Sequence, residues 1–418
     1  MNLPPRTECD ADVNAISIEE ALDRIQSRLP RLERHEIISC SDALGRITAS
    51  KVHSPISVPP FRASAMDGYA LRVSEAGSSL IVEGHSYAGH PGLDAISYGA
   101  CQRITTGARV PDDADAVVQQ ENVKVDGDTV LVNKQPNVGL NIRLPGSDSQ
   151  QGDELLESGT RIGAAQVALL AAHGMDKINV HRQIHVAVFS TGDELVSPPD
   201  SLQPGQIYDA NRSLLIALLS NPAIRISDLG ICKDSKADIQ NILERASDAD
   251  LVISSGGVSV GDADHVRAVL EQSGRVDLWK IAMKPGRPLT FGFSKPSQAF
   301  FGLPGNPVSA ALTALLFVKP AIRSMLDMES LRSPKLQLPL ASDIFKLPGR
   351  VEYQRAVICK NDEGAWQVST TGLQDSHVLS SLNKANCLIE LPIESTGGQI
   401  GDIVQVIPFT HFAEAQLQ

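Results

Sequence analysis

The chain has 418 residues, more than one hydrophobic core usually supports, so we expect several domains. Lys and Arg total 37 against 49 Asp and Glu, and the net charge of −12 argues against nucleic-acid binding because no basic run forms a local patch. An anionic ligand must instead be held by a few well-placed cations, by backbone amides or by a metal ion.

The cysteines and the N-terminus indicate the compartment. The six cysteines are far apart and form no CxxC pair, which argues against both a disulfide framework and a structural zinc site. The first residues, MNLPPRTECDADV, carry acids and prolines where a signal peptide is apolar. No apolar run approaches the length of about 20 residues that a membrane span requires. We therefore expect a cytoplasmic protein without membrane contacts.

The N-terminal third predicts one helix followed by a β-rich segment. Residues 1–14 are expected to be disordered, and Ser17 with Glu20 forms a capping box that opens the helix ALDRIQSRL. Beyond Pro55 short alternating runs predict strands, and Asp126-Gly127 is a hairpin signal. We predict a small β-rich domain at residues 58–141.

The rest of the chain predicts a linker, an α/β unit and a second β unit. Residues 15–57 and 142–183 are assigned to an N-terminal linker domain, which includes a helix before a C-capping Gly174. Strand and helix patterns alternate through residues 184–329, which predicts a mainly parallel sheet covered by helices on both faces. Residues 330–418 return to short strands, with a turn at Asn361–Gly364. The fold class is therefore α/β plus β, with a central α/β domain flanked by β-rich domains.

Chemistry is expected at the carboxyl ends of the strands in the α/β domain, where open sheets bind their ligands. Loops of unusual composition follow the predicted strands there: STGDE at 190–194, SSGGVSVGDAD at 254–264, MKPGRP at 283–288 and GLPGNPVS at 302–309.

The glycine loop is suited to a phosphate. Gly256 and Gly257 allow consecutive backbone amides to turn toward one point, although the loop matches neither a Walker loop nor GxGxxG. A tight strand-to-helix turn that needs glycine for geometry alone is the alternative interpretation.

Acidic residues follow strands at the same edge, namely Glu194, Asp234, Asp262 and Asp264. Carboxylates beside a phosphate would repel it unless a divalent cation bridged them, and magnesium is the natural candidate. Each acid could instead cap a helix, which for Asp262 is as good an interpretation as metal binding. We predict that Glu194, Asp234 and Asp264 hold the metal.

Lys284 and Arg287 flank Pro285-Gly286, so two cations lie near each other on a rigid turn that could hold a small oxyanion. His181 and His185 lie four residues apart but lead into a strand, so we interpret both as structural. The order of residues alone indicates no Ser–His–Asp arrangement.

At these loops the sequence closely resembles the molybdopterin molybdenumtransferase family, which includes the E domain of gephyrin. The resemblance runs from about residue 15 to the end. Further motifs carry it: SAMDGYA at 64–70, TTG at 105–107 with Val110-Pro111, ADAV at 114–117 and YDAN at 208–211.

The resemblance implies an elongated homodimer of four-domain subunits, with a β-barrel-like C-terminal domain. Its α/β domain would bind adenylated molybdopterin and, assisted by Mg²⁺, exchange AMP for molybdate. The molybdopterin adenylyltransferase and apo-molybdoenzymes would then be further partners.

The resemblance also implies roles for individual residues. The acid and hydroxyl positions of the active site would be Asp67, Thr106, Glu194, Asp234 and Asp264. Gly256, Gly257 and Ser259 would form the nucleotide-phosphate loop. The oxyanion pocket would comprise Lys284, Arg287, Ser309, Arg350 and Ser381. Asp67 lies far along the chain from the α/β domain, so domain or subunit packing would have to bring it to the site.

Some positions depart from the family pattern: Arg62-Ala63 for the usual Asp-Asn, Arg109 for Pro, Ser147 for Glu and Arg287 for Lys. Two other functions stay open at this point. The α/β domain could transfer the adenylyl group in the preceding step, although the flanking β domains argue against it, or the chain could be a scaffold without catalysis.

Overall fold

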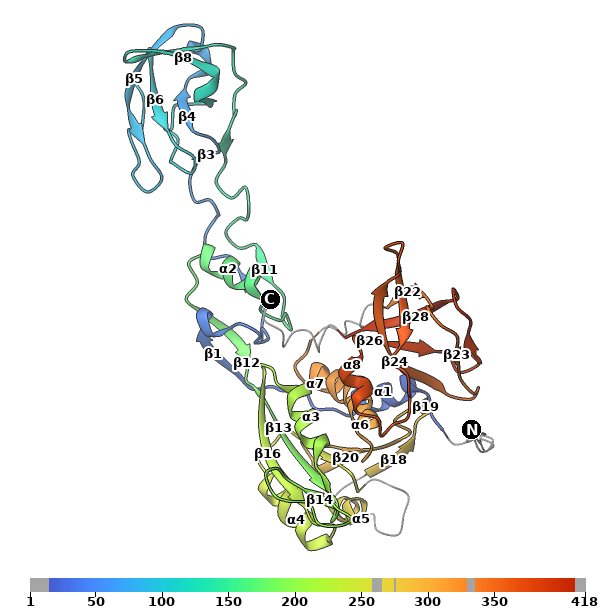
Figure 1. Ribbon diagram of the computed structural model, residues 1–418. Coiled ribbons are helices and arrows are strands. Elements are labelled where there is room, and N and C mark those ends of the chain that lie inside the picture. The colour runs from blue at the N-terminus through green and yellow to red at the C-terminus, as the bar shows by residue number, and fades with distance from the viewer. Residues whose placement is uncertain (1–14, 258–264, 274–275, 329–334, 410–418) are drawn as a thin grey trace.

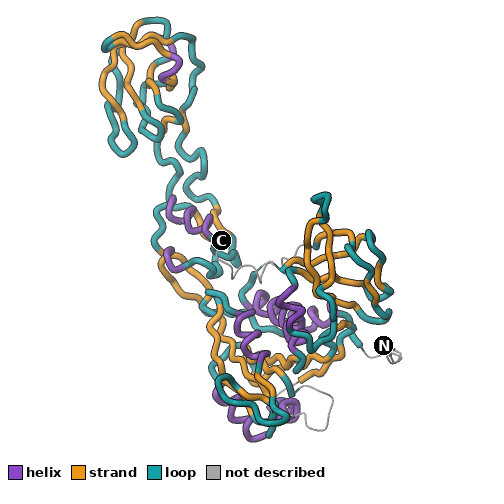
Figure 2. Tube along the Cα trace, in the orientation of Figure 1, coloured by secondary structure: helices purple, strands orange, loops and turns teal. Residues whose placement is uncertain are grey.

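The computed structural model describes residues 15–257, 265–273, 276–328 and 335–409, and the N-terminal residues expected to be disordered lie outside these ranges. Figure 1 shows an elongated molecule in which a small β lobe stands at the end of a slender connection to a larger body. Figure 2 shows most of the helices gathered in that body. We call the lobe, formed by the sheet of strands β4 to β9, the distal lobe.

The body is built on a six-stranded sheet with the order β16-β13-β17-β21-β20-β18. The predicted strands β13 (Ile184–Thr191), β16 (Ile224–Cys232), β17 (Leu251–Ser255) and β21 (Gln298–Leu303) run parallel to one another. Strands β18 (Val276–Lys280) and β20 (Pro288–Lys295) complete the sheet in antiparallel pairing. The mainly parallel α/β sheet is therefore confirmed.

Helices cover both faces of this sheet because its central strands are apolar on both sides. Val186 and Val188 of β13 pack in the core cluster that contains Leu215 of α3 and Phe317. Their neighbours Ala187 and Phe189 belong to the opposite cluster, which includes side chains of α4 and α5. The covering helices are α3 (Ala210–Leu219), α4 (Lys236–Arg245), α5 (His265–Ser273), α6 (Pro307–Thr313) and α7 (Lys319–Met325), the last two joined by the π-helical turn η4 (Ala314–Val318).

The helix from Pro307 to Met325 corrects one expectation from the sequence. Its 19 residues have a mean hydropathy of 1.3, so it meets the length and composition of a membrane span, contrary to the prediction that no segment does. Burial within the fold accounts for its composition, because 67% of this stretch is covered by the rest of the chain.

Helix α1 (Ile18–Gln26) begins after Ser17, whose hydroxyl accepts the Glu20 N–H at 3.1 Å, as predicted. Its apolar side Ile18, Ala21 and Ile25 packs in the core of the α/β unit. This packing differs from the expectation that the helix sits with the linker segments, because its apolar face finds the hydrophobic surface near Trp279 rather than the linker core.

The connection between the body and the distal lobe consists of short paired strands and one helix. Strands β1 (His35–Ser39) and β12 (Lys177–His181) pair, as do β2 (Val52–His53) and β11 (Glu154–Leu156). Helix α2 (Ala164–Ala172) packs with them and is followed by Gly174 at a φ of 69°. The domain boundaries assigned from the sequence stay a prediction.

The distal lobe is a six-stranded sheet with the order β7-β4-β6-β5-β9-β8. The predicted hairpin at Asp126-Gly127 joins β8 to β9, and Gly127 has a φ of 57°. The strands are β4 (Gly68–Leu71), β5 (Ser79–Ser86), β6 (Ala100–Ile104), β7 (Ala116–Gln119), β8 (Val123–Asp126) and β9 (Thr129–Val132). Strand β3 (Ala63–Ser64) pairs with β10 (Ile142–Arg143) beside this sheet.

The C-terminal unit is a small barrel that includes a strand from the α/β unit. Its sheet order is β19-β24-β26-β28-β22, with β25 on the other part of β24, and a bridge between Leu340 and Val368 joins the ends. The strands are β19 (Met283–Lys284), β22 (Leu336–Pro339), β24 (Val351–Lys360), β25 (Trp366–Thr370), β26 (Cys387–Leu391) and β28 (Ile403–Pro408). The predicted turn at Asn361–Gly364 links β24 to β25, which pair between Lys360 and Trp366.

Short elements complete the fold. They are β14 (Leu195–Val196) paired with β15 (Ile207–Tyr208), β23 (Ile344–Phe345) paired with β27 (Gly397–Gly398), helix α8 (Ser380–Lys384), and the 3-10 turns η1 (Cys40–Asp42), η2 (Val73–Glu75) and η3 (Gln120–Asn122).

We expect Phe301→Ala in β21 to destabilise the α/β unit by about 3–5 kcal/mol, the usual result of removing a fully buried aromatic ring. Phe301 is 0% exposed and its ring centroid lies 5.0 Å from that of Phe291. The free energy of unfolding would be measured by urea titration with Trp279 fluorescence, because Trp279 lies 5.8 Å from Phe291.

The measurement uses a Trp366→Phe background, which leaves Trp279 as the reporter of the two tryptophans in the chain. Phe345→Ala is the control, since Phe345 is 61% exposed and its loss should change stability by less than about 0.5 kcal/mol. Equal effects of the two substitutions would contradict the assignment of the core to this sheet.

Candidate active site

The loops singled out by the sequence meet at one rim of the α/β sheet. Ser190 of β13 is opposite Ser255 of β17, and Ser255 is opposite Leu303 of β21, so the three strands end side by side. The Gly256 N–H donates to the Leu303 carbonyl at 3.1 Å. We call the segments 191–194, 255–257 and 303–309 the loop rim.

Glycine is required in the loop rim by the approach of its own backbone. Gly256 has a φ of 89°, and a Cβ there would lie 2.4 Å from the Thr191 carbonyl oxygen. At Gly257, with a φ of 66°, a Cβ would lie 2.6 Å from the Thr191 methyl. The geometric interpretation of this glycine pair therefore holds whether or not a phosphate binds. Ser259, Asp262 and Asp264, in the continuation of this loop, lie outside the described residues.

Asn211 holds two segments of the loop rim together, a role that was not predicted for it. Its side-chain amide donates to the Ser255 hydroxyl at 2.8 Å and to the Gly305 carbonyl at 2.7 Å. Asp209 caps α3 and accepts a hydrogen bond from the Ser190 hydroxyl at 3.0 Å. The signal in the sequence was the YDAN motif, which places polar side chains at the first turn of a helix that faces the rim.

Two of the predicted metal ligands lie on neighbouring loops, Glu194 in the loop rim and Asp234 beside it. Glu194 is exposed, and its carboxylate folds back over Gly192, where a Cβ would lie 2.7 Å from an oxygen. The Asp234 N–H donates to the Asp193 carboxylate at 3.3 Å, which joins the loops after β13 and β16. The Asp234 Oδ1 atom is buried without a hydrogen-bond partner in the described parts of the chain.

A buried carboxylate oxygen without a donor is the kind of group that a cation satisfies. Within the described ranges, however, no three His, Cys, Asp or Glu side chains gather closely enough to form a complete site. The loop with the third predicted ligand, Asp264, is not among those ranges. The predicted metal site therefore stays a prediction, supported by Asp234.

A cavity of about 350 Å³ lies next to the loop rim. Four of the five residues predicted for the oxyanion pocket line it: Lys284, Arg287, Ser309 and Arg350. The remaining lining residues are Met283, Pro285, Gly286, Pro288, Pro304, Gly305, Asn306, Gln374, Asp375 and Ser376. The α/β unit and the C-terminal barrel thus supply opposite walls.

Pairing of β19 with β24 brings the two walls together. Met283 is opposite Val351 and Lys284 is opposite Glu352 in a parallel ladder. The Lys284 ammonium lies 3.2 Å from the Glu352 carboxylate, which is itself buried and accepts the Gln354 amide at 3.1 Å. Glu352 therefore holds the ammonium of the lysine that lines the cavity, a role not foreseen from the sequence.

Ser381, the fifth predicted residue, does not line the cavity. It is 2% exposed, accepts the Arg355 Nε–H at 3.0 Å and donates to the Val378 carbonyl at 2.6 Å. A serine of the C-terminal unit that does line the cavity is Ser376, whose carbonyl accepts the Val308 N–H at 3.1 Å. The sequence could not distinguish the two serines, because the loop that precedes α8 turns Ser376 outward and the helix turns Ser381 inward.

Asp67 and Thr106 form a pair at the distal lobe. The Asp67 carboxylate accepts the Thr106 N–H at 2.7 Å and its hydroxyl at 2.9 Å, and these bonds lower the pKa of this exposed carboxyl. Asp67 directly precedes β4, which Figure 1 places in the lobe, at the other end of the molecule from β19 and α6. Within one chain the structure does not bring this pair to the cavity.

Arg62 and Arg109, two of the departures from the family pattern, bind neighbouring groups in this lobe. The Arg62 guanidinium donates to the carbonyls of Pro111, Asp112 and Ala114 at 3.2, 3.0 and 2.6 Å. Arg109 pairs with Asp94 at 2.6 Å and with Asp112 at 3.3 Å. Both arginines therefore secure the turn at 111–114, whereas nothing in the structure explains Ser147.

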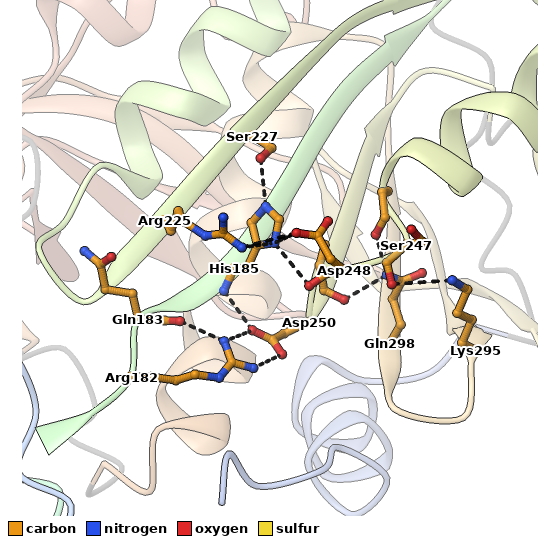
Figure 3. Close-up of polar contacts among 12 residues, drawn as sticks. Arg182, Gln183, His185, Arg225, Ser227, Ser247, Asp248, Asp250, Lys295 and Gln298 are labelled. Atoms are coloured by element: carbon orange, nitrogen blue, oxygen red, sulfur yellow. Dashed lines mark hydrogen bonds and ion pairs between the residues drawn. The ribbon is translucent and has the colours of Figure 1, made fainter. Parts of the chain in front are cut away.

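His185 belongs to a hydrogen-bond network at the start of β13. This is the amino end of the strand, whereas the loop rim follows its carboxyl end. Figure 3 shows its ring between Ser227 and Asp248, with Arg225 alongside. The Arg225 guanidinium lies 2.7 Å from His185 Nδ1, and Ser227 Oγ lies 2.7 Å from Nε2. Nδ1 also lies 3.2 Å from the Asp248 carbonyl oxygen. All these contacts lie at the start of β13, at the other end of this strand from the loop rim, which supports a structural role.

Comparisons with known proteins agree with these features. Residues 16–174 match the model "MoeA N-terminal region (domain I and II)", residues 187–324 match "Probable molybdopterin binding domain", and residues 337–409 match "MoeA C-terminal region (domain IV)". The cavity thus lies between segments that match the second and third models.

Full-length relatives carry the same similarity. Molybdopterin molybdenumtransferase of Haemophilus influenzae is 40% identical over 402 residues, covering 95% of this chain and 99% of that protein. Gephyrin of Dictyostelium discoideum is 31% identical, covering 94% of this chain and 62% of that protein. A molybdopterin biosynthesis moea protein from Pyrococcus horikosii aligns with a TM-score of 0.79 and 32% identity, covering 95% and 99% of the two chains.

We expect Gly256→Ala to lower the free energy of unfolding by about 2–4 kcal/mol, because the new methyl would meet a backbone carbonyl at a φ that alanine rarely adopts. Gly305→Ala is the matched control in the same rim, since the nearest atom to a Cβ there is Gly256 Cα at 4.0 Å. Thermal unfolding of the two variants would test this. A melting temperature of Gly256→Ala equal to that of the control would show that the loop relaxes and that glycine is not needed for the turn.

Proposed function

This chain belongs to the molybdopterin molybdenumtransferase family, a premise from which we propose that it inserts molybdate into adenylated molybdopterin and releases AMP. It is a transferase of molybdenum cofactor biosynthesis. The observation that carries the detailed proposal is the cavity where Lys284, Arg287 and Arg350 converge beside the glycine-containing loop rim.

The cavity is suited to the oxyanion substrate. Molybdate is a tetrahedral dianion, and the lining cations can each direct N–H donors at its oxygens. Ser309, a residue that is 5% exposed, adds a hydroxyl near the start of α6. We assign Ser376 to this group in place of Ser381, since it lines the wall that faces Lys284.

The loop rim is suited to the pyrophosphate of the adenylated pterin. Its positive-φ glycines turn the backbone tightly between β17 and the cavity, where amides can face an anion. Glu194 and Asp234, together with Asp264, would hold Mg²⁺ beside this phosphate. When bound, the ion would neutralise the pyrophosphate and the leaving AMP.

The Asp67–Thr106 pair supports a homodimer as the active form. Its carboxylate is charged at neutral pH, since hydrogen bonds from Thr106 lower its pKa, and it is exposed rather than buried in the lobe. We propose that the distal lobe of one subunit presents this pair to the cavity of a second copy.

The five cysteines in the described ranges are free thiols, which supports a reducing cytoplasm as the compartment.

Lys284→Ala should raise the molybdate concentration for half-maximal AMP release about 10- to 100-fold, because a charge-assisted contact to the dianion is lost. The assay would supply purified protein with adenylated pterin, Mg²⁺ and molybdate, and follow both AMP release and molybdenum incorporation. Lys295→Ala is the control, since Lys295 lies in the same unit but contacts the Ser247 carbonyl at the opposite edge (Figure 3).

Unchanged molybdate dependence in Lys284→Ala would contradict the assignment of the cavity. Accumulation of adenylated pterin from ATP and molybdopterin, without consumption of molybdate, would instead indicate the preceding adenylyl transfer.

A mixed dimer tests the contribution of the second subunit. Chains with Asp67→Asn and Lys284→Ala would be co-expressed with different tags, and the dimers that carry both tags purified. If the lobe acts on the partner's cavity, one of the two sites contains neither substitution, so at limiting molybdate the activity should be about half of wild type although each variant alone is nearly inactive. An inactive mixed dimer would place lobe and cavity of one chain in the same site, and full activity of Asp67→Asn alone would remove Asp67 from the reaction.

A further inference from the structure

We propose that Arg103 of the distal lobe binds a tetrahedral oxyanion of the substrates, phosphate or molybdate, in the cavity of the second subunit. The inference rests on the proposed function, because it adds a cation to the Asp67–Thr106 pair that the lobe would present there. Arg103 lies in β6, three residues before Thr106 and opposite Tyr69 of β4. The lobe would then bring two opposite charges, and not a lone carboxylate, to an anion site.

The sheet of the distal lobe places Arg103 and Asp67 in one small network. Strands β4 and β6 are neighbours in this sheet (Figure 1). One terminal nitrogen of Arg103 donates to the Gln120 side-chain oxygen at 2.5 Å, and the Gln120 N–H donates to the Asp67 carbonyl at 3.3 Å. Thr106 holds the carboxylate of the same aspartate through two further hydrogen bonds. Both charged groups are therefore fixed by the ends of the same strands.

The guanidinium of Arg103 is held in place by an aromatic ring. Its central carbon lies 4.9 Å from the centroid of the Tyr69 ring, and Tyr69 is 7% exposed. Arg103 itself is only partly buried. A planar cation stacked on a buried ring loses little freedom when it forms further hydrogen bonds, which favours ligand binding.

The charge of Arg103 is not used within the lobe as the charges of its neighbours are. Arg72 and Arg109 each form ion pairs with two carboxylates, and Arg62 donates to three carbonyls. In the described part of the chain Arg103 has no ion pair with a carboxylate, and its hydrogen bond goes to a neutral amide. Its charge therefore remains for a ligand.

Arg103 nevertheless acts on Asp67 from a short distance. Hydrogen bonds from Thr106 are the main cause of the lowered pKa of the Asp67 carboxyl, and the positive charge of Arg103 lowers this pKa further. The same attraction means that the negative charge of Asp67 is partly offset where the two side chains meet the solvent.

Such an offset is needed if the lobe meets an anion site. Lys284, Arg287 and Arg350 line the proposed cavity for molybdate. A lone carboxylate brought there would repel the oxyanions and compete with them for these cations. Arg103 would counter the repulsion from Asp67, and its planar fork of N–H donors suits two oxygens of one phosphate or molybdate.

The alternative role for Arg103 is to stabilise the lobe by covering Tyr69. Two substitutions separate the roles. Arg103→Met keeps an unbranched stem that can pack on the ring but removes the charge. Arg103→Lys keeps the charge without the guanidinium plane. A packing role predicts that methionine is tolerated, whereas anion binding predicts that lysine is the better replacement.

Steady-state AMP release by the whole dimer tests the proposal, with adenylated pterin and molybdate varied in turn. In Arg103→Met we expect the half-saturating concentration of one substrate to rise about 10- to 100-fold with kcat little changed, because a charge-assisted contact in the bound state is lost. A rise for the pterin assigns the contact to phosphate, and a rise for molybdate assigns it to that ion. Arg103→Lys should stay within about fivefold of wild type.

The matched control is Lys124→Met, which removes a cation from the same lobe. Lys124 is exposed on β8, at the far edge of the sheet from β4 and β7, so its loss should leave both half-saturating concentrations unchanged. Thermal unfolding of all variants would show whether the lobe remains folded. If Arg103→Met does not fold, Arg103→Gln replaces it as the uncharged variant, with the same expected rise.

A mixed dimer locates the contact. Chains with Arg103→Met and Lys284→Ala would be co-expressed with different tags, and the doubly tagged dimers purified. If Arg103 acts in the cavity of the second subunit, one site contains neither substitution, so the activity at limiting substrate should be about half of wild type. An inactive mixed dimer would overturn the assignment to the second subunit.

The outcomes separate this inference from the proposed function. Wild-type kinetics in the folded uncharged variant, or equal impairment by lysine and by the uncharged residue, would overturn the role of the Arg103 charge and leave the molybdate cavity in place. Absence of molybdate-dependent AMP release by the wild-type protein would instead overturn the proposed function itself.

Discussion

The cavity depends on one short stretch of backbone pairing, in which Met283 and Lys284 of the α/β unit add to the C-terminal sheet beside Val351 and Glu352. Without this ladder the two walls would belong to separate units, joined only by chain connections and surface contacts. The pairing places Lys284 against a buried carboxylate and positions Arg350, one residue before β24, on the same cavity. Because ladder hydrogen bonds fix register, a shift by one residue would turn Lys284 to the other face of the sheet.

The loop rim depends on a different constraint, the common ending of parallel strands. Parallel pairing of β13, β17 and β21 makes their carboxyl ends coincide, so three loops distant in sequence become neighbours. Close approach of Gly256 to the Thr191 carbonyl then leaves no room for a side chain. The composition of these loops is thus set by backbone packing first, and any phosphate recognition is built on a turn that glycine already requires.

Local patterns in the sequence were sufficient for the elements but not for their long-range neighbours. The alternation after residue 184, the Ser17 cap and both hairpin turns each depend on residues close in sequence, and all are present in the structure. The packing of α1 depends on which surfaces meet after folding, and so does the presence of Ser376 rather than Ser381 at the cavity. Glu352 was missed for the same reason, since its importance arises from pairing with a strand 68 residues away.

Charge at the cavity must act against the charge of the whole chain. The net charge of −12 repels anions in general, but salt screens surface charges beyond about 10 Å. Cations that line a cavity act over shorter distances, where water screens them less. If the cavity holds the oxyanion as we propose, an acidic exterior with a local positive interior disfavours polyanions that need an extended surface and favours a compact dianion that can enter. Lys284 is already held by its hydrogen bond to Glu352, so little ordering of this side chain would remain to oppose the binding of an anion.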